Sequence, residues 1–382
     1  MFIPFREKNI LNNNLISYSV SNRDGFINQR EYFDDGGKAV YASKKNSLII
    51  DFNTFAYNPS RINVGSLCLY KNKEKGLVSP IYEVFKLRND QNPDFFYLWF
   101  KTGIFKKIIA NNSNKSVRDT LNLKQFEDQL IIIPILSEQN TISSLFSVLD
   151  SLITLHQRKL ILLKNTKNRL LEKMFCDEKS EFPSIRFKEF TNAWEQWKAK
   201  NLFIPFREKN ILNNNLISYS VSNRDGFINQ REYFDDGGKA VYASKKNSLI
   251  IDFNTFAYNP SRINVGSLCL YKNKEKGLVS PIYEVFKLRN DQNPDFFYLW
   301  FKTGIFKKII ANNSNKSVRD TLNLKQFEDQ LIIIPILSEQ NTISSLFSVL
   351  DSLITLHQRG YKWRENKWKK TIYCYTNIFK IE

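Results

Sequence analysis

The sequence is poor in the residues that usually build metal sites and disulfide frameworks. Its 382 residues include only four cysteines and two histidines, and no two cysteines form a CxxC pair. We therefore predict buried thiols in a reducing compartment rather than a zinc site, and a cytoplasmic location. No apolar run reaches the length of a membrane span. The apolar stretch at the start of the sequence is too short for the hydrophobic region of a signal peptide. We expect no membrane partner.

The sequence also lacks the motifs of common enzymes. It has no glycine-rich cofactor fingerprint after a strand, no phosphate-binding loop and no carboxylate–lysine cluster of the nuclease type. A Ser/His/Asp nucleophile is unsupported, because the single histidine of each repeat lies in a helical pattern. Asn58-Pro-Ser-Arg61 is only superficially similar to the Asn-Pro-Pro-Tyr loop of amino-methyltransferases. We predict a non-catalytic chain with no cofactor of its own and no bound metal.

What the sequence does contain is a duplication. Residues Phe2–Arg158 occur again, letter for letter, as Phe203–Arg359. A repeat of this length is too long for a solenoid unit and suits one globular domain with a helical extension. The formal charge of +18 favours a polyanionic partner, with nucleic acid first among the candidates. The alternative is an AT-rich genome that favours lysine and asparagine codons.

Each repeat begins with a mixed pattern that predicts a compact α+β domain. Short apolar, β-branched runs between turn residues predict strands, and spaced aromatic residues predict a helix before the last strand. The expected strands are 47–51, 65–70, 76–80, 81–85 and 130–135, and the expected helical stretch is 94–109.

After Ser137 the apolar spacing becomes that of a long helix with a coiled-coil-like seam. A helix over Glu138–Phe175 has a length of ~57 Å at ~1.5 Å per residue. In the second copy the pattern stops after Arg359, and Gly360 is a plausible helix stop. The seam residues, which are also the candidates for partner docking, are Leu145, Leu149, Leu152, His156, Leu160 and Leu163, with Leu346, Leu350, Leu353 and His357 in the second copy.

These patterns divide the chain into six parts. We predict globular domains at 1–136 and 203–337, with long helices at 137–178 and 338–359, the second of them truncated. Residues 179–202 form a connector, and residues 360–382 form a basic and aromatic tail that does not keep the seam.

Several stretches resemble the specificity subunits of type I restriction–modification systems. The helix 137–158, its continuation 170–175 and the segment Pro183–Trp197 resemble that family's spacer region. The strings 55–65, 76–80 and 116–122 resemble its target-recognition domains. Together they cover nearly the whole chain except its last 23 residues. The first copy departs from the pattern, because it begins at Phe2 without the lead-in that precedes the second copy.

The resemblance implies two recognition domains held by antiparallel helices. It also implies double-stranded DNA, two methyltransferase subunits and restriction/translocase subunits as partners. S-adenosylmethionine, ATP and magnesium would then be bound by those partners and not by this chain. Because the two domains are identical, we predict that the target is an interrupted palindrome. The alternatives are a non-catalytic helical scaffold and the product of an inactive recombination cassette.

Arginine can contact guanine, and asparagine can contact adenine, so polar loop residues are the candidates for DNA contact. A structural reading competes with this one, because Asn58-Pro-Ser60 is typical of turns. The candidates of the first copy are Asn22, Arg23, Tyr57, Asn58, Arg61, Asn63, Asn112, Asn114, Lys115, Ser116 and Arg118. Their counterparts are Asn223, Arg224, Tyr258, Asn259, Arg262, Asn264, Asn313, Asn315, Lys316, Ser317 and Arg319.

Overall fold

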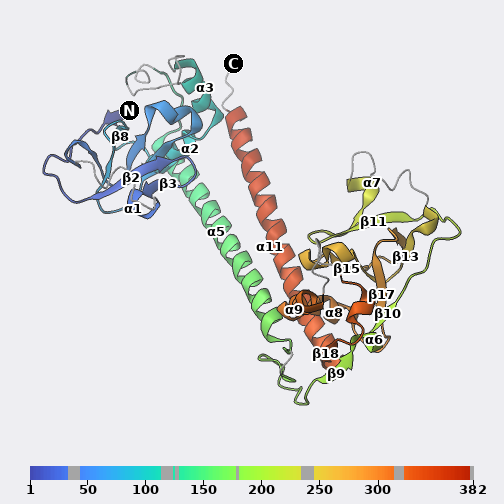
Figure 1. Ribbon diagram of the computed structural model, residues 1–382. Helices are drawn as coiled ribbons and strands as arrows, with labels where there is room; N and C mark the ends of the chain where they lie inside the picture. Colours follow the sequence, from blue (N-terminus) through green and yellow to red (C-terminus); the bar gives the residue numbers. More distant parts are fainter. Residues whose placement is uncertain are drawn as a thin grey trace. The chain divides into compact units, whose positions relative to one another are not determined.

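The computed structural model describes residues 1–32, 44–112, 124, 129–177, 180–233, 245–313 and 322–378, with the backbone alone for residues 112 and 360–378. The chain divides into two compact units (Figure 1). The first unit holds residues 1–157 and 360–382, and the second holds residues 158–359. Each unit contains one globular domain and parts of two long helices.

The first unit is built on two four-stranded sheets. One sheet has the order β1-β8-β5-β6 and is antiparallel throughout, while the other has the order β3-β2-β7-β4 and contains the parallel pair β2–β7. The strands are β1 (Phe2–Pro4), β2 (Ile16–Ser21), β3 (Gly25–Asn28), β4 (Leu48–Ile50), β5 (Thr54–Tyr57), β6 (Leu67–Tyr70), β7 (Gly76–Val78) and β8 (Glu83–Leu87).

Short helices accompany these sheets. They are α1 (Gln29–Tyr32), η1 (Lys44–Asn46), η2 (Pro59–Val64), α2 (Pro93–Trp99) and α3 (Gly103–Asn112). The Asn92 side chain accepts a hydrogen bond from the Phe95 amide and so caps α2. Phe95 and Phe96, in the first turn of α2, are buried in the core. Stacked and edge-on phenylalanine rings fill this core; for example, the Phe55 and Phe85 rings lie 5.0 Å apart. The aromatic composition is therefore explained by the packing of α2 and α3 against the β1-β8-β5-β6 sheet.

The second unit repeats the two sheets and adds a third. The repeated orders are β10-β17-β14-β15 and β12-β11-β16-β13, and the extra sheet pairs β18 with β9. The strands are β9 (Glu195–Lys198), β10 (Phe203–Pro205), β11 (Ile217–Ser222), β12 (Gly226–Asn229), β13 (Leu249–Ile251), β14 (Phe256–Tyr258), β15 (Leu268–Leu270), β16 (Gly277–Val279), β17 (Glu284–Leu288) and β18 (Leu331–Ile334). The helices that accompany them are α6 (Ala199–Leu202), α7 (Gln230–Tyr233), η3 (Lys245–Asn247), η4 (Pro260–Val265), α8 (Pro294–Trp300), α9 (Gly304–Asn313) and α10 (Leu324–Phe327).

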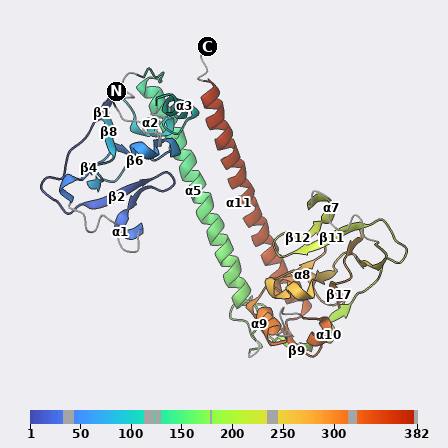
Figure 2. The same cartoon turned by 45° about the horizontal axis from the view of Figure 1, so that its top comes forward.

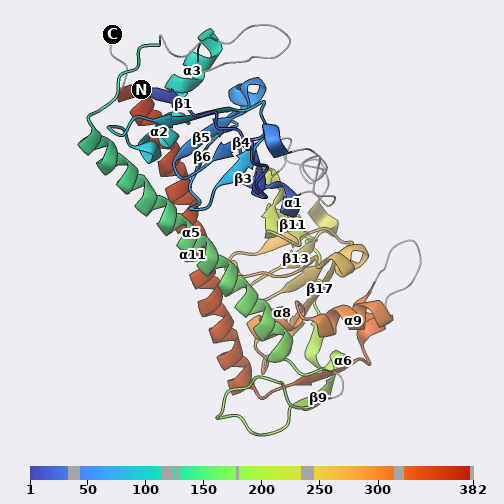
Figure 3. The ribbon, with the colours of Figure 1, turned by 90° about the vertical axis from the view of Figure 1, so that its left-hand side faces the viewer.

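The segment 179–202 is expected to be a connector, but its described residues 180–202 belong to the second domain. Trp194, Ala199 and Leu202 are buried in the main core of that domain. β9 pairs antiparallel with β18 (Figure 1), and Figure 3 shows β9 close to α6. The strand expected at 130–135 forms only in the second copy, as β18. In the first copy the same letters form no strand, because no lead-in strand lies beside them among the described residues.

The two long helices are α5 (Leu136–Lys173) and α11 (Leu337–Ile378). The expected stop at Gly360 is not observed, since α11 continues for 18 residues beyond it. A glycine inside a helix costs only ~1 kcal/mol relative to alanine, which the flanking helix can absorb. Within the second unit, residues 158–173 of α5 run antiparallel to residues 337–359 of α11 (Figure 1). There Lys167 pairs with Asp351, and Leu163 and Leu170 pack against the core that holds Phe347 and Leu350.

Candidate nucleic-acid interface and docking helix

Two loops meet at one end of each domain. The turn at residues 22–24 joins β2 to β3, and η2 ends at Gly65, which has the left-handed φ of 84°. A Cβ atom at Gly65 would lie 2.8 Å from the Asn22 side-chain oxygen, so the two loops are in contact. Gly266 (φ 82°) and Asn223 repeat this arrangement at 3.0 Å. Glycine suits both positions, because it adopts the left-handed backbone conformation readily and has no Cβ atom to clash with the asparagine side chain.

This loop pair presents basic and amide groups to solvent. The Arg23 side chain is 92% exposed, and its backbone is held by the Ser21 hydroxyl, which accepts hydrogen bonds from the Arg23 and Asp24 amides at 3.2 Å. Arg61, Asn22 and Asn63 are also exposed. The counterparts Asn223, Arg224, Arg262 and Asn264 are exposed in the second copy. Eight of the expected DNA contacts thus gather in two equivalent patches on ordered backbone.

Four of the expected contacts have structural roles. Tyr57 and Tyr258 are 3% and 4% exposed within the aromatic cores, so they cannot reach a ligand. Burial raises the pKa of both hydroxyls far above the usual value, so they stay protonated. Asn58 and Asn259 cap η2 and η4, accepting from the Ser60 and Ser261 amides at 3.0 Å. The prediction that these residues contact DNA is wrong for the tyrosines, which lie on strands buried on both faces.

The remaining expected contacts are only partly described. Asn313 is half-buried, and its amide donates to the Ile309 carbonyl and to the Gln330 side chain, which closes the end of α9. The side chain of Asn112 is not described. The other members lie outside the described residues and stay predictions: Asn114, Lys115, Ser116, Arg118, Asn315, Lys316, Ser317 and Arg319.

Sequence reasoning missed one arginine at the same end of each domain. Arg6 pairs with Glu83 at 3.1 Å, and Arg207 pairs with Glu284 at 3.3 Å. Glu83 lies opposite Tyr57 across the β5–β8 pair, at the strand end from which η2 departs. Arg6 is therefore a neighbour of the loop pair. It could be found only from the strand register, because 55 residues separate it from Arg61.

Each long helix is fixed to its own domain by a hydrogen-bonded glutamine. In the first unit Gln139 is 1% exposed, accepts from the Asn92 amide at 2.9 Å, and donates to Gln91 and to the Pro134 carbonyl at 2.9 Å. Figures 1 and 2 show α2 next to these first turns of α5. Gln340 makes the same bonds in the second unit, at 2.8–3.0 Å. We call this set of hydrogen bonds around Gln139 or Gln340 the joint. Each long helix therefore leaves its domain from the same joint.

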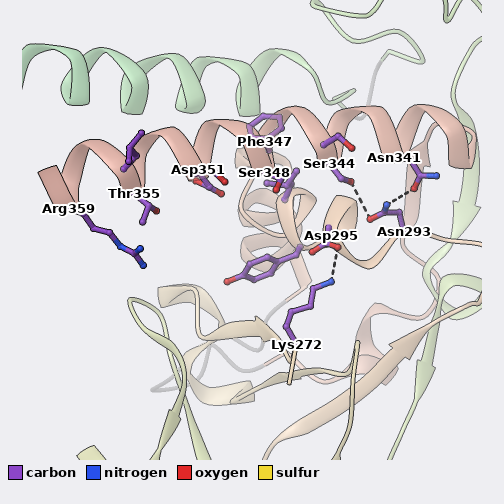
Figure 4. A pocket seen from close by; sticks show the side chains of 15 residues that line it. Lys272, Asn293, Asp295, Asn341, Ser344, Phe347, Ser348, Asp351, Thr355 and Arg359 are labelled. Carbon is purple, nitrogen blue, oxygen red and sulfur yellow. Dashed lines mark hydrogen bonds and ion pairs between the residues drawn. The ribbon is translucent and has the colours of Figure 1, made fainter. Parts of the chain in front are cut away.

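A groove of about 980 Å³ lies beside this joint in the second unit (Figure 4). Hydroxyl and amide groups of α11 line one wall, including Asn341, Ser344 and Ser348, and Lys272 forms a 2.7 Å ion pair with Asp295 on the other wall. The groove can hydrogen-bond a peptide or a loop.

The expected helix seam is divided by the structure. Leu350 is 8% exposed in the core, and Leu163 and Leu346 pack against it, while Leu149, Leu160, His156 and His357 are half-buried. Leu145, Leu152 and Leu353 are 50%, 37% and 38% exposed, so they are not packed. The domain-facing stripe runs instead through Gln139, Ser143 and Phe146, and Phe146 was missed because it lies one position beyond Leu145.

The exposed positions form a second stripe on the same helices. Leu145, Val148, Leu152 and Leu155 follow a 3–4 spacing on α5, with exposures of 37–61%. Val349, Leu353 and Leu356 repeat the stripe on α11, with exposures of 38–64%. We call these residues the outer stripe. An apolar row of this kind is a surface suited to another protein chain.

The rest of the described chain offers little chemistry. Its residues contain no group of three or more metal-ligating side chains, and none of its helices is long and apolar enough to span a membrane. Burial raises the pKa of the Cys68 thiol to about 11 and that of Cys176 to about 12. Both thiols are therefore protonated near neutral pH, and they are poor nucleophiles.

The chain is thus a protein of two repeated sheet domains, each with a pair of contacting loops and a long helix attached by the same hydrogen bonds. The family model "Type I restriction modification DNA specificity domain" matches the chain twice, over residues 2–165 and 163–362. The chain belongs to this family, whose members are the non-catalytic DNA-recognition subunits of type I restriction–modification complexes.

Relatives and solved structures agree with this assignment. The putative type I restriction enzyme MjaX specificity subunit of Methanocaldococcus jannaschii is 23% identical over 341 residues, which are 85% of this chain and 77% of that protein. The EcoBI specificity subunit of Escherichia coli is 20% identical over 69% of this chain and 60% of its own length. The solved S subunit of the type I system from M. genitalium aligns with a TM-score of 0.50 at 14% identity, covering 97% and 98% of the two chains. That similarity supports the α+β fold with two domains.

Proposed function

We propose that this chain reads an interrupted palindrome in double-stranded DNA, with one identical half-site for each copy. The observation that carries the proposal is that two letter-identical domains present the same loop pair and the same helix joint. Two identical readers related by a two-fold axis match the two-fold symmetry of duplex DNA. The half-sites are then the same sequence on opposite strands.

The loop pair supplies the contacts. Arg23 and Arg61, with Asn22 and Asn63 beside them, can approach base edges, and Arg6 adds a phosphate contact. Arginine binds guanine N7 and O6 bidentately, and asparagine binds adenine N6 and N7 in the same way. The α5 and α11 helices set the distance between the half-sites, on the order of one to two duplex turns of ~34–36 Å each.

The outer stripe is the proposed docking surface for two methyltransferase subunits. Its apolar side chains are exposed in the chain alone, and its positions recur on α5 and α11. S-adenosylmethionine, ATP and magnesium are bound by the methyltransferase and restriction/translocase partners in this scheme. This chain then supplies recognition and spacing, and the partners supply the chemistry.

Salt dependence tests the DNA-binding part of the proposal. A DNA reader loses affinity along a straight line of log K against log salt, with a slope of about −0.9 for each phosphate neutralised. Fluorescence anisotropy with a labelled duplex pool, in the presence of methyltransferase subunits, measures this slope between about 50 and 200 mM salt. A helical scaffold or an inactive cassette product gives no such slope, because it makes no phosphate contacts.

A further inference from the structure

The two loops of each loop pair come from different sheets. In the first unit the turn at residues 22–24 joins β2 to β3, whereas η2 and Gly65 lie between β5 and β6 of the β1-β8-β5-β6 sheet. The second unit has the same division, with the turn at residues 223–225 and Gly266. A protein that reads bases with both loops has to hold the two sheets in one fixed arrangement, because a binding site tolerates shifts of only about 0.5 Å.

The last residues of β2 are bound by side chains of the other sheet. Backbone pairing of β2 with β7 covers residues 16–17, and β2 continues to Ser21. Past this pairing the Val20 amide donates to the Tyr82 hydroxyl at 3.3 Å, and the Cys68 thiol donates to the Ser21 carbonyl at 3.4 Å. Cys68 lies on β6, and Tyr82 directly precedes β8. Two hydrogen bonds between a side chain and the backbone thus join the sheets directly before the first loop of the pair.

The second unit contains the same two hydrogen bonds. The Val221 amide donates to the Tyr283 hydroxyl at 3.3 Å, and the Cys269 thiol donates to the Ser222 carbonyl at 3.4 Å. The tyrosines and cysteines of both units are buried. Burial raises the pKa of both thiols, so they keep the proton that they donate near neutral pH. We call these four residues the anchors: Cys68, Tyr82, Cys269 and Tyr283.

The anchors act at the base of the turn that presents Arg23. Cys68 binds the carbonyl of Ser21, and the hydroxyl of Ser21 accepts hydrogen bonds from the Arg23 and Asp24 amides at 3.2 Å. On the other loop, Cys68 follows Gly65 by three residues. One thiol therefore connects the ends of both loops, and a shift of the Ser21 carbonyl would move Arg23 relative to Gly65.

We propose that the anchors are positioning residues for sequence readout, which align the two loops of each pair and so set selectivity without touching DNA. The inference rests on the proposed function, because it takes the loop pair as the DNA-reading surface. Loss of an anchor leaves the exposed arginines in place. Attraction to the phosphate backbone is therefore retained, while the base contacts lose their geometry.

Paired tyrosine variants test the proposal on the full chain with methyltransferase subunits. Tyr82→Phe with Tyr283→Phe removes the two hydroxyls and keeps the aromatic rings. The probes are the duplex that the unchanged chain selects from a random library and a random duplex pool of the same length. We expect the ratio of the two affinities to fall at least about fivefold, the lower bound for loss of one base contact. The affinity for the random pool and its salt slope stay unchanged.

Tyr70→Phe with Tyr271→Phe is the matched control. These tyrosines belong to the same core clusters as Tyr82 and Tyr283, and their buried hydroxyls also make one backbone hydrogen bond each. They donate at 2.9 Å to carbonyls in the turns that follow β6 and β15, at the strand ends away from the loop pairs. The control therefore loses a comparable hydrogen bond and keeps its affinity ratio.

Cysteine variants provide a second measurement. Cys68→Ala with Cys269→Ala lowers the affinity ratio, whereas Cys68→Ser with Cys269→Ser restores it, because a serine hydroxyl can donate to the same carbonyl. Thermal unfolding followed by circular dichroism confirms that each variant is folded at the temperature of the binding assay.

Two results would overturn this inference alone: the same affinity ratio in the Tyr82→Phe, Tyr283→Phe variant as in its control, or equal ratios for the alanine and serine variants. Absence of any selectivity in the unchanged chain would overturn the proposed function as well.

Discussion

Glu138 and Glu339 are the same residue in the two copies, yet their energetic roles differ. Glu339 is buried and makes the bidentate pair with Arg186, whereas Glu138 faces solvent. Removing one partner of a buried ion pair leaves the other charge uncompensated, which costs about 3–5 kcal/mol. An exposed substitution changes stability by less than about 0.5 kcal/mol.

We therefore expect Glu339→Ala to loosen residues 181–201, which Arg186 and β9 hold against the second domain, and Glu138→Ala to have no such effect. Hydrogen exchange measured by mass spectrometry can follow this, because a peptide over residues 190–201 occurs once in the chain. In Glu339→Ala the amides of β9 exchange faster, and in Glu138→Ala they exchange at the original rate. Equal protection of β9 in both variants would show that the ion pair does not hold the segment.

The exposed loop arginines give a prediction about affinity. Replacing Arg61 and Arg262 together with alanine removes one proposed contact from each half-site, and a base contact is worth about 1–3 kcal/mol. We expect weaker binding and relaxed selectivity at one base pair of each half-site, measured by competition with duplexes substituted at single positions. Lys73→Ala with Lys274→Ala is the matched control, because these lysines follow β6 and β15 at the opposite strand end. An equal loss of affinity in the lysine variant would show that the arginines contribute only general positive charge and no base contact.

At the level of single residues, the sequence identified loop positions but not their exposure. Arg23 and Arg61 were found because arginine in a turn is accessible by default. Tyr57 looked equivalent, but it ends a strand that lies between two packed layers and is buried on both faces. Arg6 could not be found, since its place depends on strand pairing across more than seventy residues.

The joint between helix and domain is the element that makes a helix useful as a spacer. Gln139 and Gln340 each satisfy buried groups of their own domain, and a buried group left without its partner costs about 1–3 kcal/mol. We expect Gln139→Ala with Gln340→Ala to keep half-site recognition but to broaden the gap between half-sites. Selection of bound duplexes reports the distribution of gap lengths. Thr141→Ala with Thr342→Ala should leave the gap unchanged, because these hydroxyls donate to the Ser137 and Ser338 carbonyls of their own helices.

The outer stripe gives a separate prediction about assembly. Leu152→Asp with Leu353→Asp places charges on exposed positions, so the chain should fold normally and lose its methyltransferase subunits. Size-exclusion chromatography with light scattering measures the complex. Leu350→Asp is unsuitable for this test, because Leu350 is a core residue and its substitution would unfold part of the second unit. Retention of both subunits by the Leu152→Asp, Leu353→Asp variant would place docking elsewhere.

At the level of elements, periodicity predicted a long helix over residues 138–175, and α5 spans Leu136–Lys173, but periodicity did not predict its contacts. The 3–4 spacing of leucines is real, yet the domain binds the neighbouring stripe of Gln139, Ser143 and Phe146. Residues 130–133 and 331–334 show why local sequence is insufficient. Identical letters form β18 in one copy and no strand in the other, because strand formation needs a partner and β9 is supplied once.

For the whole molecule, the central claim is that two identical domains read one half-site twice. The duplication itself was visible in the sequence, and it fixes the equivalence of the loop pairs and joints. Among the described residues, the segment between the copies adds β9 and the Arg186–Glu339 ion pair to the second domain.

The most direct test is selection of bound duplexes from a random library, with methyltransferase subunits present. We expect enrichment of an inverted repeat, in which one short half-site and its reverse complement are separated by a constant gap. A single ungapped half-site, or two unrelated half-sites, would contradict the claim that the identical copies read the same sequence on opposite strands.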